Sequence, residues 1–372
     1  RKALKITNND SELKVKVLNN LGAFYFRLKN YDDSKLLFEQ VVNFKEIMKE
    51  NRALHAIALH NLAVIHFFTG NPSISNKLVT KSIKLKSNIA QPSIYFFNDY
   101  KLLAEIDLSE NKFKVALKNI LSGINTASYK KYSHPDAIID LNKIIIHYEL
   151  IDVFYIRGQI YKKLYVKTNE VNNIVLSFEN YKTIYNLFDH LRKIYNGHDI
   201  KEIFSINIYH IISEAVNVVY DLYSLTGKKI DSVLTFIEKS KGMILLEELS
   251  DSDAKKISKI PKNLLSKEQN IKSQIAFYQK KIYCGLKPKE KIEYEDKLFE
   301  AKQSLDDLIS KFEKDYKDYY DLKYNFKTVT PKEIQDRLSE EDTVLEYFLG
   351  EEYIYLFIIT SAITEVKRIP KS

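Results

Sequence analysis

The sequence predicts an all-α protein: a superhelix of about five helix pairs, followed by a helical hairpin and a short, truncated α/β segment. Three observations predict this fold. The small residues Gly22, Ala63 and Ala104 are each 41 positions apart, a period typical of stacked helical repeats. Apolar residues around them follow the i, i+3, i+4, i+7 spacing of a helix face. After residue 340 this spacing gives way to short runs of β-branched and aromatic residues.

The first three repeats each contain two predicted helices separated by a polar break. The breaks are Lys29-Asn30, Gly70-Asn71 and Glu110-Asn111. A second small residue lies on the second helix of each repeat, and it lets the two helices approach closely. These residues are Ser34, Ser75 and Ala116. The three repeats cover 11–49, 51–88 and 92–128.

The fourth and fifth helix pairs are less regular. Gly158 lies 54 residues after Ala104, so 13 residues are inserted relative to the period. We expect the first helix of the fourth pair to begin at Ser133-His134-Pro135-Asp136, with Ser133 as its cap. The remaining helices of these pairs are predicted at 171–195, 200–225 and 229–250.

Beyond residue 250 the repeat period is absent. Two helical patterns at 263–284 and 288–323 predict an antiparallel hairpin. A short helix is then expected from Thr330 to Leu338, and three strands at 343–349, 353–360 and 363–369. Both faces of these strands are apolar and need cover, so we expect the chain to stop inside a domain. The predicted domains are 1–250 (solenoid), 251–328 (hairpin linker) and 329–372 (start of an α/β domain).

The repeat units resemble the tetratricopeptide repeat, in a long version of about 40 residues. A more specific resemblance follows from residues 235–246, which read Thr-Phe-Ile-Glu-Lys-Ser-Lys-Gly-Met-Ile-Leu-Leu. This stretch resembles the junction in bacterial proteins that join such repeats to a CHAT domain, a caspase-like peptidase domain. In that family a helical hairpin, a short helix and strands come next, as they do here over roughly 200–372.

The resemblance implies that the parent protein is a cysteine peptidase with a His–Cys dyad on later strands. The sequence has no His after His210, and its one cysteine, Cys284, lies at the bend of the predicted hairpin. No catalytic residue is therefore carried over, and we expect this chain not to be an enzyme. Cys284 is read as an incidental loop residue.

Composition limits the other functions. Lys and Arg total 57 against 49 acidic residues, only seven of the 57 are Arg, and the lysines are interleaved with acidic residues. This pattern does not favour a nucleic-acid partner. The longest apolar run, 353–359, is too short to cross a bilayer, so no membrane partner is expected. A single cysteine suits the cytoplasm. His60 and His66 are six apart and do not share a helix face, so neither a metal nor a cofactor is expected.

The candidate site is the concave groove, which the first helix of every repeat lines. The candidate groove residues are Asn19, Phe26, Arg27, His60, Val64, Phe67, Phe68, Lys101 and Glu105. Phe67 and Phe68 are adjacent and cannot both enter one helix contact, so one is a candidate exposed anchor. The alternative is that both cover the next repeat. The expected partner is a protein, a peptide or the chain's own peptidase domain, and a homodimer stays open. The competing hypothesis is a non-enzymatic assembly adaptor.

Overall fold

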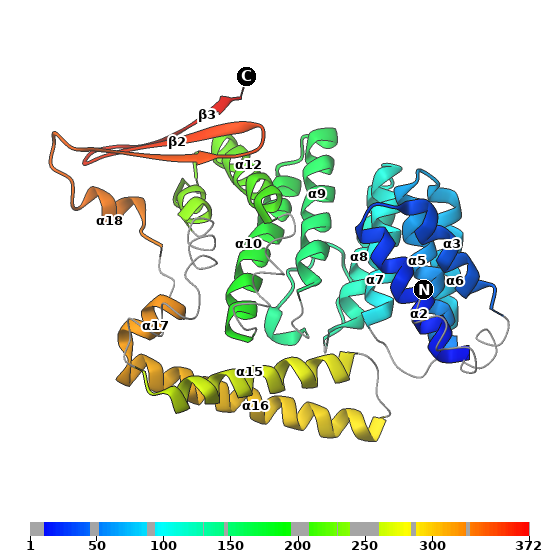
Figure 1. The fold of residues 1–372 in the computed structure, drawn as a ribbon. Coiled ribbons are helices and arrows are strands. Elements are labelled where there is room, and N and C mark those ends of the chain that lie inside the picture. Colours follow the sequence, from blue (N-terminus) through cyan, green and yellow to red (C-terminus); the bar gives the residue numbers. More distant parts are fainter. Residues whose placement is uncertain are drawn as a thin grey trace. The chain divides into compact units, whose positions relative to one another are not determined.

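The computed structural model describes residues 11–44, 52–87, 94–128, 130–144, 148–194, 208–228, 230–238, 260–283, 288–324 and 328–371. The chain forms two compact units, one of residues 1–145 and 281–291 and the other of residues 146–280 and 292–372. Adjacent helix pairs and one small antiparallel sheet make up the described structure (Figure 1), as the sequence predicts. No helix in these residues combines the length and the apolar character needed to cross a bilayer.

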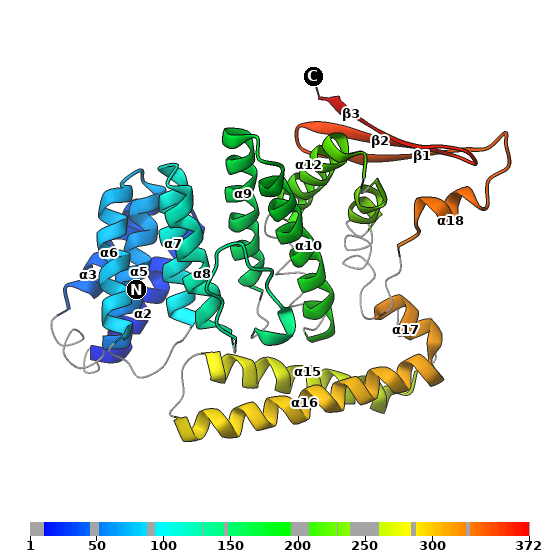
Figure 2. The ribbon, with the colours of Figure 1, turned by 180° about the vertical axis from the view of Figure 1, so that it is seen from behind.

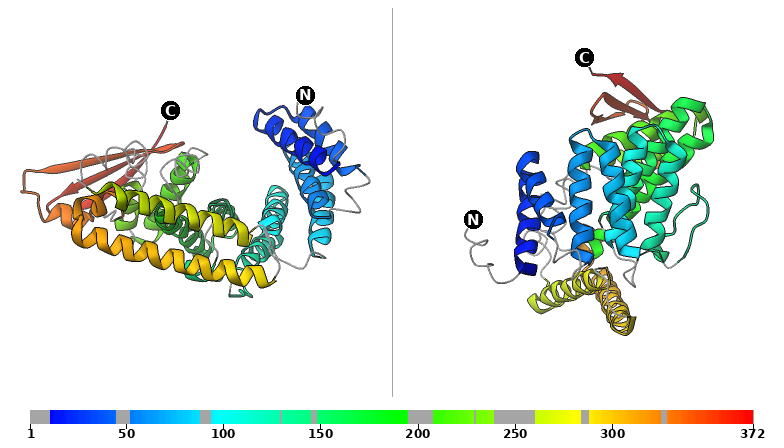
Figure 3. Two further views of the ribbon diagram at one scale, coloured as in Figure 1. Left: turned by 60° about the horizontal axis from the view of Figure 1, so that its bottom comes forward. Right: turned by 90° about the vertical axis from the view of Figure 1, so that its right-hand side faces the viewer.

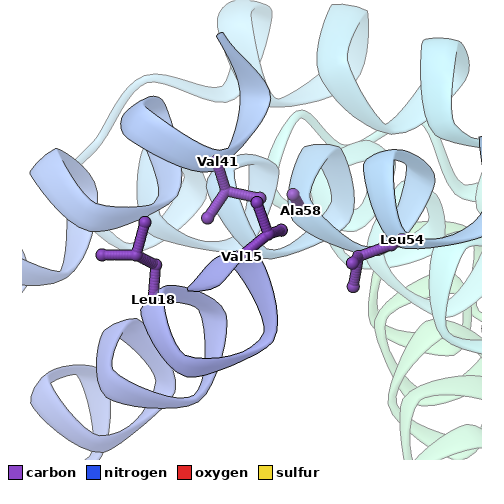
Figure 4. Close-up of a cluster of buried hydrophobic side chains, with 5 residues drawn as sticks. All are labelled: Val15, Leu18, Val41, Leu54 and Ala58. Atoms are coloured by element: carbon purple, nitrogen blue, oxygen red, sulfur yellow. The ribbon is translucent and has the colours of Figure 1, made fainter. Parts of the chain in front are cut away.

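The first unit contains the three predicted repeats, each a pair of neighbouring helices (Figure 2). The pairs are α2 (Ser11–Arg27) with α3 (Tyr31–Val42), α5 (Arg52–Phe68) with α6 (Pro72–Ser87), and α7 (Ile94–Ser109) with α8 (Phe113–Thr126). Successive pairs share core residues. In Figure 4, Val15 and Leu18 of α2 lie with Val41 of α3 and with Leu54 and Ala58 of α5. The hydrophobic core is therefore continuous from one pair to the next.

The predicted small-residue contacts hold the helices of a pair together. A Cβ added to Gly22 would lie 2.8 Å from the Phe38 ring, so any larger residue would have to displace that ring. The contact also contains a hydrogen bond, because the Ser34 hydroxyl donates to the Gly22 carbonyl at 2.7 Å. Ser75 donates to Ala63 in the same way, at 2.7 Å. Each of these serines is fully buried, and the hydroxyl satisfies a carbonyl at the point of closest helix approach.

The turns inside the three repeats share one backbone geometry. Lys29, Gly70 and Asn111, again 41 residues apart, have φ angles of 58°, 76° and 58°. At the first turn, the Lys29 N–H donates to the Phe26 carbonyl and the next N–H donates to the Tyr25 carbonyl. The other two turns repeat these bonds. This Schellman arrangement needs a residue in the left-handed region, where glycine is least strained.

We therefore expect Lys29→Gly to stabilise the first unit by about 0.5–1 kcal/mol, since glycine relieves the left-handed backbone but gains freedom in the unfolded chain. Hydrogen exchange of the α5 amides measures the free energy of opening. Gly70→Ala is the matched control. No atom lies within 4 Å of its added Cβ, so only the backbone strain acts, and it is expected to destabilise. Equal exchange in both variants and the wild type would contradict the argument.

One predicted helix start is wrong. Residues 130–140 are irregular, a 3₁₀ turn covers Leu141–Lys143, and α9 begins only at Leu150. The insertion is instead a loop held by side chains. The Asn125 amide donates to the Tyr132 carbonyl and its oxygen accepts from the Tyr132 N–H, both at 2.8 Å. His134 precedes a proline, which disfavours helical backbone at that residue.

The second unit begins with α9 (Leu150–Thr168) and α10 (Val171–Ile194), which pack side by side, and α12 (Ile208–Thr226), which packs on α10. The close contact predicted at Gly158 is present: a Cβ added to this glycine would lie 3.0 Å from the Tyr181 ring, and the Ser177 hydroxyl donates to the Gly158 carbonyl. Residues 230–238 are helical after the turn at Gly227. Most of the CHAT-like junction, residues 239–246, lies outside the described residues, as does Cys284.

The predicted hairpin consists of α15 (Lys262–Tyr283) and α16 (Pro288–Asp315), which run side by side (Figure 3), followed by α17 (Lys317–Lys323). A buried carboxylate, Glu268 of α15, lies between α15 and α17. It forms ion pairs with Lys272 at 3.1 Å and Lys323 at 2.9 Å, and it accepts a hydrogen bond from the Tyr319 hydroxyl at 2.6 Å. Burial raises the pKa of Glu268, but the two ammonium groups and the tyrosine hydroxyls lower it to about 2.

The C-terminal segment forms the predicted strands β1 (Thr343–Leu349), β2 (Tyr353–Thr360) and β3 (Thr364–Pro370), preceded by the short helix α18 (Pro331–Gln335). The strands form an antiparallel meander in the order β1-β2-β3, with Phe348 opposite Tyr355 and Phe357 opposite Val366. One face of the sheet is buried. The other exposes large apolar side chains, among them Leu345, Tyr347, Leu349 and Ile369.

Candidate interaction surfaces

The predicted groove residues all lie on the first helices of the three repeats in the first unit. Neighbouring first helices touch, since α5 contacts both α2 and α7. Val64, Lys101 and Glu105 are half-buried on these helices, and Arg27 is exposed at the end of α2. The helices therefore form one continuous surface. Some of its residues bond to the neighbouring repeat, and others are exposed to solvent.

Two of the predicted groove residues join neighbouring repeats. The Asn61 amide of α5 donates to the Asn19 side chain of α2 at 2.9 Å. One repeat further on, His60 Nδ1 lies 2.7 Å from Asp99 Oδ1 of α7. Both candidates are half-buried and already bonded. Asn19 and His60 are thus inter-repeat links, with only part of each side chain open to a ligand.

Beneath His60 lies a buried polar cluster that the sequence patterns do not predict. Asp99 is fully buried, and Lys86 Nζ contacts its Oδ2 at 2.6 Å. The Ser82 hydroxyl lies 3.1 Å from the same oxygen and 2.8 Å from the Ala56 carbonyl. Burial lowers the pKa of Lys86, and Asp99 opposes that shift. Because the cluster joins α5, α6 and α7 and is closed to solvent, it fixes the stacking of repeats two and three.

Phe67 and Phe68 point to different neighbours. Phe67 is half-buried and packs on the core formed by Ala63 and Val79 with two residues of α7. Phe68 remains 58% exposed. Its ring lies against the previous repeat, with centroids 5.3 Å from Phe26 and 6.4 Å from Tyr31. We call Phe26, Tyr31, Phe67 and Phe68 the aromatic cluster. The other three rings contact the exposed Phe68.

Helix α12 lies beside the sheet (Figure 1), and polar contacts join the two. The Glu351 N–H donates to the Ser213 hydroxyl at 2.6 Å, and the Tyr355 hydroxyl donates to Asn217 at 3.1 Å. The Tyr209 hydroxyl donates to the backbone carbonyl of Leu349. These α12 residues are four apart and share one helix face. The sequence signal that could have found them is a stripe of polar side chains in an otherwise apolar helix.

Arg368 of β3 completes this junction. Its guanidinium group pairs with Asp221 and donates to Asn217 at 2.7 Å. The same group lies over the rings of Tyr220, at 4.6 Å, and Tyr353, at 4.7 Å. A planar cation between two aromatic faces is held in one orientation. The sheet is therefore attached to α12 both near Tyr209 and Ser213 and near Asp221.

Two tyrosine hydroxyls of the second unit lie in a hydrogen-bonded group around Glu214. Burial, and then the neighbouring Glu214, raise the pKa values of the Tyr155 and Tyr181 hydroxyls, so both stay protonated at neutral pH. In the described parts of the chain, no group of three His, Cys, Asp or Glu side chains is placed to hold a metal ion.

The lysines are less evenly interleaved with acidic residues than the whole sequence indicates. Helix α6 carries four lysines and α8 carries two, and neither helix contains an acidic residue. Lys86 is buried on Asp99, but Lys77, Lys81, Lys114 and Lys118 are exposed. Isolated lysines without arginine or exposed aromatic neighbours are the pattern of a solvated helix face. The aromatic cluster and the exposed apolar face of the sheet therefore remain the two candidate interaction surfaces.

No family model matches the sequence, and no curated protein matches it either.

Proposed function

We propose that this protein is a protein-binding scaffold or sensor that receives a peptide or a partner protein on the first helices of its repeats, with Phe68 as the anchor. One observation carries the proposal: Phe68 is 58% exposed and yet packed against three other aromatic rings. Aromatic side chains, phenylalanine included, are enriched in the cores of protein interfaces. Val64, Arg27, Lys101 and Glu105 supply the surrounding contacts.

In its specific form, the proposal is that the chain is the regulatory part of a bacterial protein of the tetratricopeptide–CHAT type, located in the cytoplasm. Two features support it: the resemblance of residues 235–246, and the order of helix pairs, helical hairpin and sheet along the chain. In this proposal the sheet is the start of the caspase-like domain, which is itself a partner of the repeats. In this proposal no catalytic residue, cofactor or metal ligand is assigned to the described residues, and the expected partners are proteins rather than nucleic acid or membranes.

The test is peptide binding by the Phe68→Ala variant. Peptides are selected against the full chain from a random library displayed on phage, and their affinities are then measured by fluorescence anisotropy. We expect the substitution to weaken binding by about 2 kcal/mol, roughly thirty-fold, as for a hot-spot residue. The matched control is Phe299→Ala, since Phe299 of α16 is 69% exposed. Equal affinities for the wild type and Phe68→Ala would exclude Phe68 as the anchor.

The competing function, an assembly adaptor, is favoured by the apolar sheet face that exposes Leu345, Tyr347 and Leu349. A patch of this kind is typical of protein contacts. Light scattering distinguishes the two proposals. If the chain dimerises, and Tyr347→Lys makes it monomeric while Phe68→Ala has no effect on any binding, the protein is an adaptor. If Phe68→Ala abolishes peptide binding and leaves the oligomeric state unchanged, it is a sensor.

A further inference from the structure

His210 of α12 is the point at which three structural elements meet. Its Nδ1 atom lies 2.6 Å from the Glu351 carboxylate in the turn between β1 and β2. Its Nε2 atom lies 2.6 Å from the Tyr155 hydroxyl of α9. A second carboxylate, Glu214 of α12, lies 3.7 Å from Nε2. The imidazole therefore sits between two carboxylates that come from different elements, and it is 41% exposed.

With a neutral imidazole, each hydrogen bond has one donor. Nδ1–H donates to Glu351, and the Tyr155 hydroxyl donates to Nε2. The Tyr155 oxygen accepts from the Gln159 amide at 2.7 Å. Glu214 accepts a separate hydrogen bond from the Tyr181 hydroxyl of α10, at 2.7 Å. No donor is left over, but two carboxylates then face each other across a neutral ring.

A protonated imidazole gives a second complete arrangement. Both ring nitrogens now donate, so Nε2–H points to the Tyr155 oxygen. The Tyr155 hydroxyl, which also lies within hydrogen-bonding reach of Glu214, turns its proton to that carboxylate. In the described part of the chain, His210 is the only basic side chain paired with either Glu214 or Glu351. The positive charge thus has two carboxylate partners, one of them in the sheet.

We infer that His210 is a proton-dependent latch, which holds the turn between β1 and β2 against α9 and α12 more tightly when the imidazole is protonated. Docking and protonation favour each other by linkage. The attachment of the sheet is therefore tighter around a charged imidazole than around a neutral one, and a change of pH tests this. As a form of regulation the latch rests on the proposed sensor function. The latch is measured on the chain without a binding partner. The latch and the sensor function can therefore be disproved independently of each other.

The test is hydrogen exchange of the full chain between pH 5.5 and 8.5, corrected for the intrinsic pH dependence of exchange. The reporters are the amides of Gly350 and Glu351, which donate to Tyr353 and Ser213. We expect their protection to fall about three- to five-fold over this range, which corresponds to a half-exposed charge pair. His210→Gln keeps a hydrogen-bonding side chain without a titrating ring, and its protection is expected to be independent of pH.

The matched control is His190→Gln. His190 of α10 is half-buried, and its bond in the described residues is to the Asn186 carbonyl of its own helix, so this change should leave the turn as in the wild type. Glu351→Gln is a second test, because it removes the sheet's carboxylate and should also abolish the pH dependence. The latch is overturned if wild-type protection does not vary with pH, or if His210→Gln and Glu351→Gln retain the wild-type variation.

Discussion

Replacing Asp99 with asparagine is expected to lower the free energy of unfolding of the first unit by about 3–5 kcal/mol. The reason is that the substitution leaves the positive charge of Lys86 buried. Lys86 is only 3% exposed, and Asp99 is its ionic partner at 2.6 Å. Asparagine fills the same space but removes the negative charge that faces the buried ammonium group. The loss exceeds that of an ordinary hydrogen bond, which is worth about 1 kcal/mol.

The measurement is hydrogen exchange of buried amides in α5 and α7, which reports the opening of this unit. Glu110→Gln is the matched control, because it breaks a pair with Lys112 that is equally short, at 2.5 Å, but exposed. We expect no measurable change there. The loss of stability in Asp99→Asn should also become smaller at high pH, because Lys86 is then buried in its neutral form. A loss that is equal at both sites, or absent at Asp99, would show that burial of the pair does not set its contribution.

The second large effect is expected at Glu268 of the helical hairpin. Its pKa is lowered from 4.5 to about 2, which corresponds to about 3 kcal/mol of stability. Since the folded state holds the carboxylate in its charged form, this stability is fully present above pH 4.5. It is lost as the pH falls toward 2, where the unfolded chain already carries the proton. Glu268→Gln should remove the same amount at pH 7, because Lys272 stays buried beside a neutral amide.

This prediction is checked by following the exchange of the α15 amides from pH 2.5 to 7 in both proteins. The two stability curves should lie farthest apart at neutral pH and converge at the acid end. Glu293→Gln, which breaks the exposed pair with Lys297 at 2.5 Å, serves as the control and should match the wild type. Curves that stay parallel through the acid range would mean that another group sets the difference.

The helix pairs could be predicted because their signals are local. Gly22 and Ser34 meet across one turn of fixed geometry, so a 41-residue spacing of small residues is enough to place them. The strands are equally predictable, because each is a short run rich in β-branched and aromatic residues and is joined to the next by a short turn. Here local sequence and tertiary contacts agree.

The misses depend on contacts between residues far apart in the sequence. The loop at 130–144 looked like a helix start, but Asn125 fixes Tyr132 through two hydrogen bonds that no local pattern reveals. The buried pair of Lys86 and Asp99 joins α6 to α7, and no local sequence pattern predicts that these two residues meet. The α12 junction joins residues about 140 positions apart, such as Ser213 and Glu351, and their pairing depends on how the sheet packs. Side-chain partners at this range follow from tertiary structure alone.

The repeated turn has a consequence for how the length of the repeat array can change. The segment from Asn30 to Gly70 begins just after one left-handed turn residue and ends on the next. A duplicated copy of this segment would meet the original at a junction identical to the native turn, with the same two backbone hydrogen bonds. Whole repeats can thus be gained or lost by unequal exchange of 41-residue blocks. The array is adjustable in steps of one repeat, and the surface formed by its first helices grows or shrinks with it.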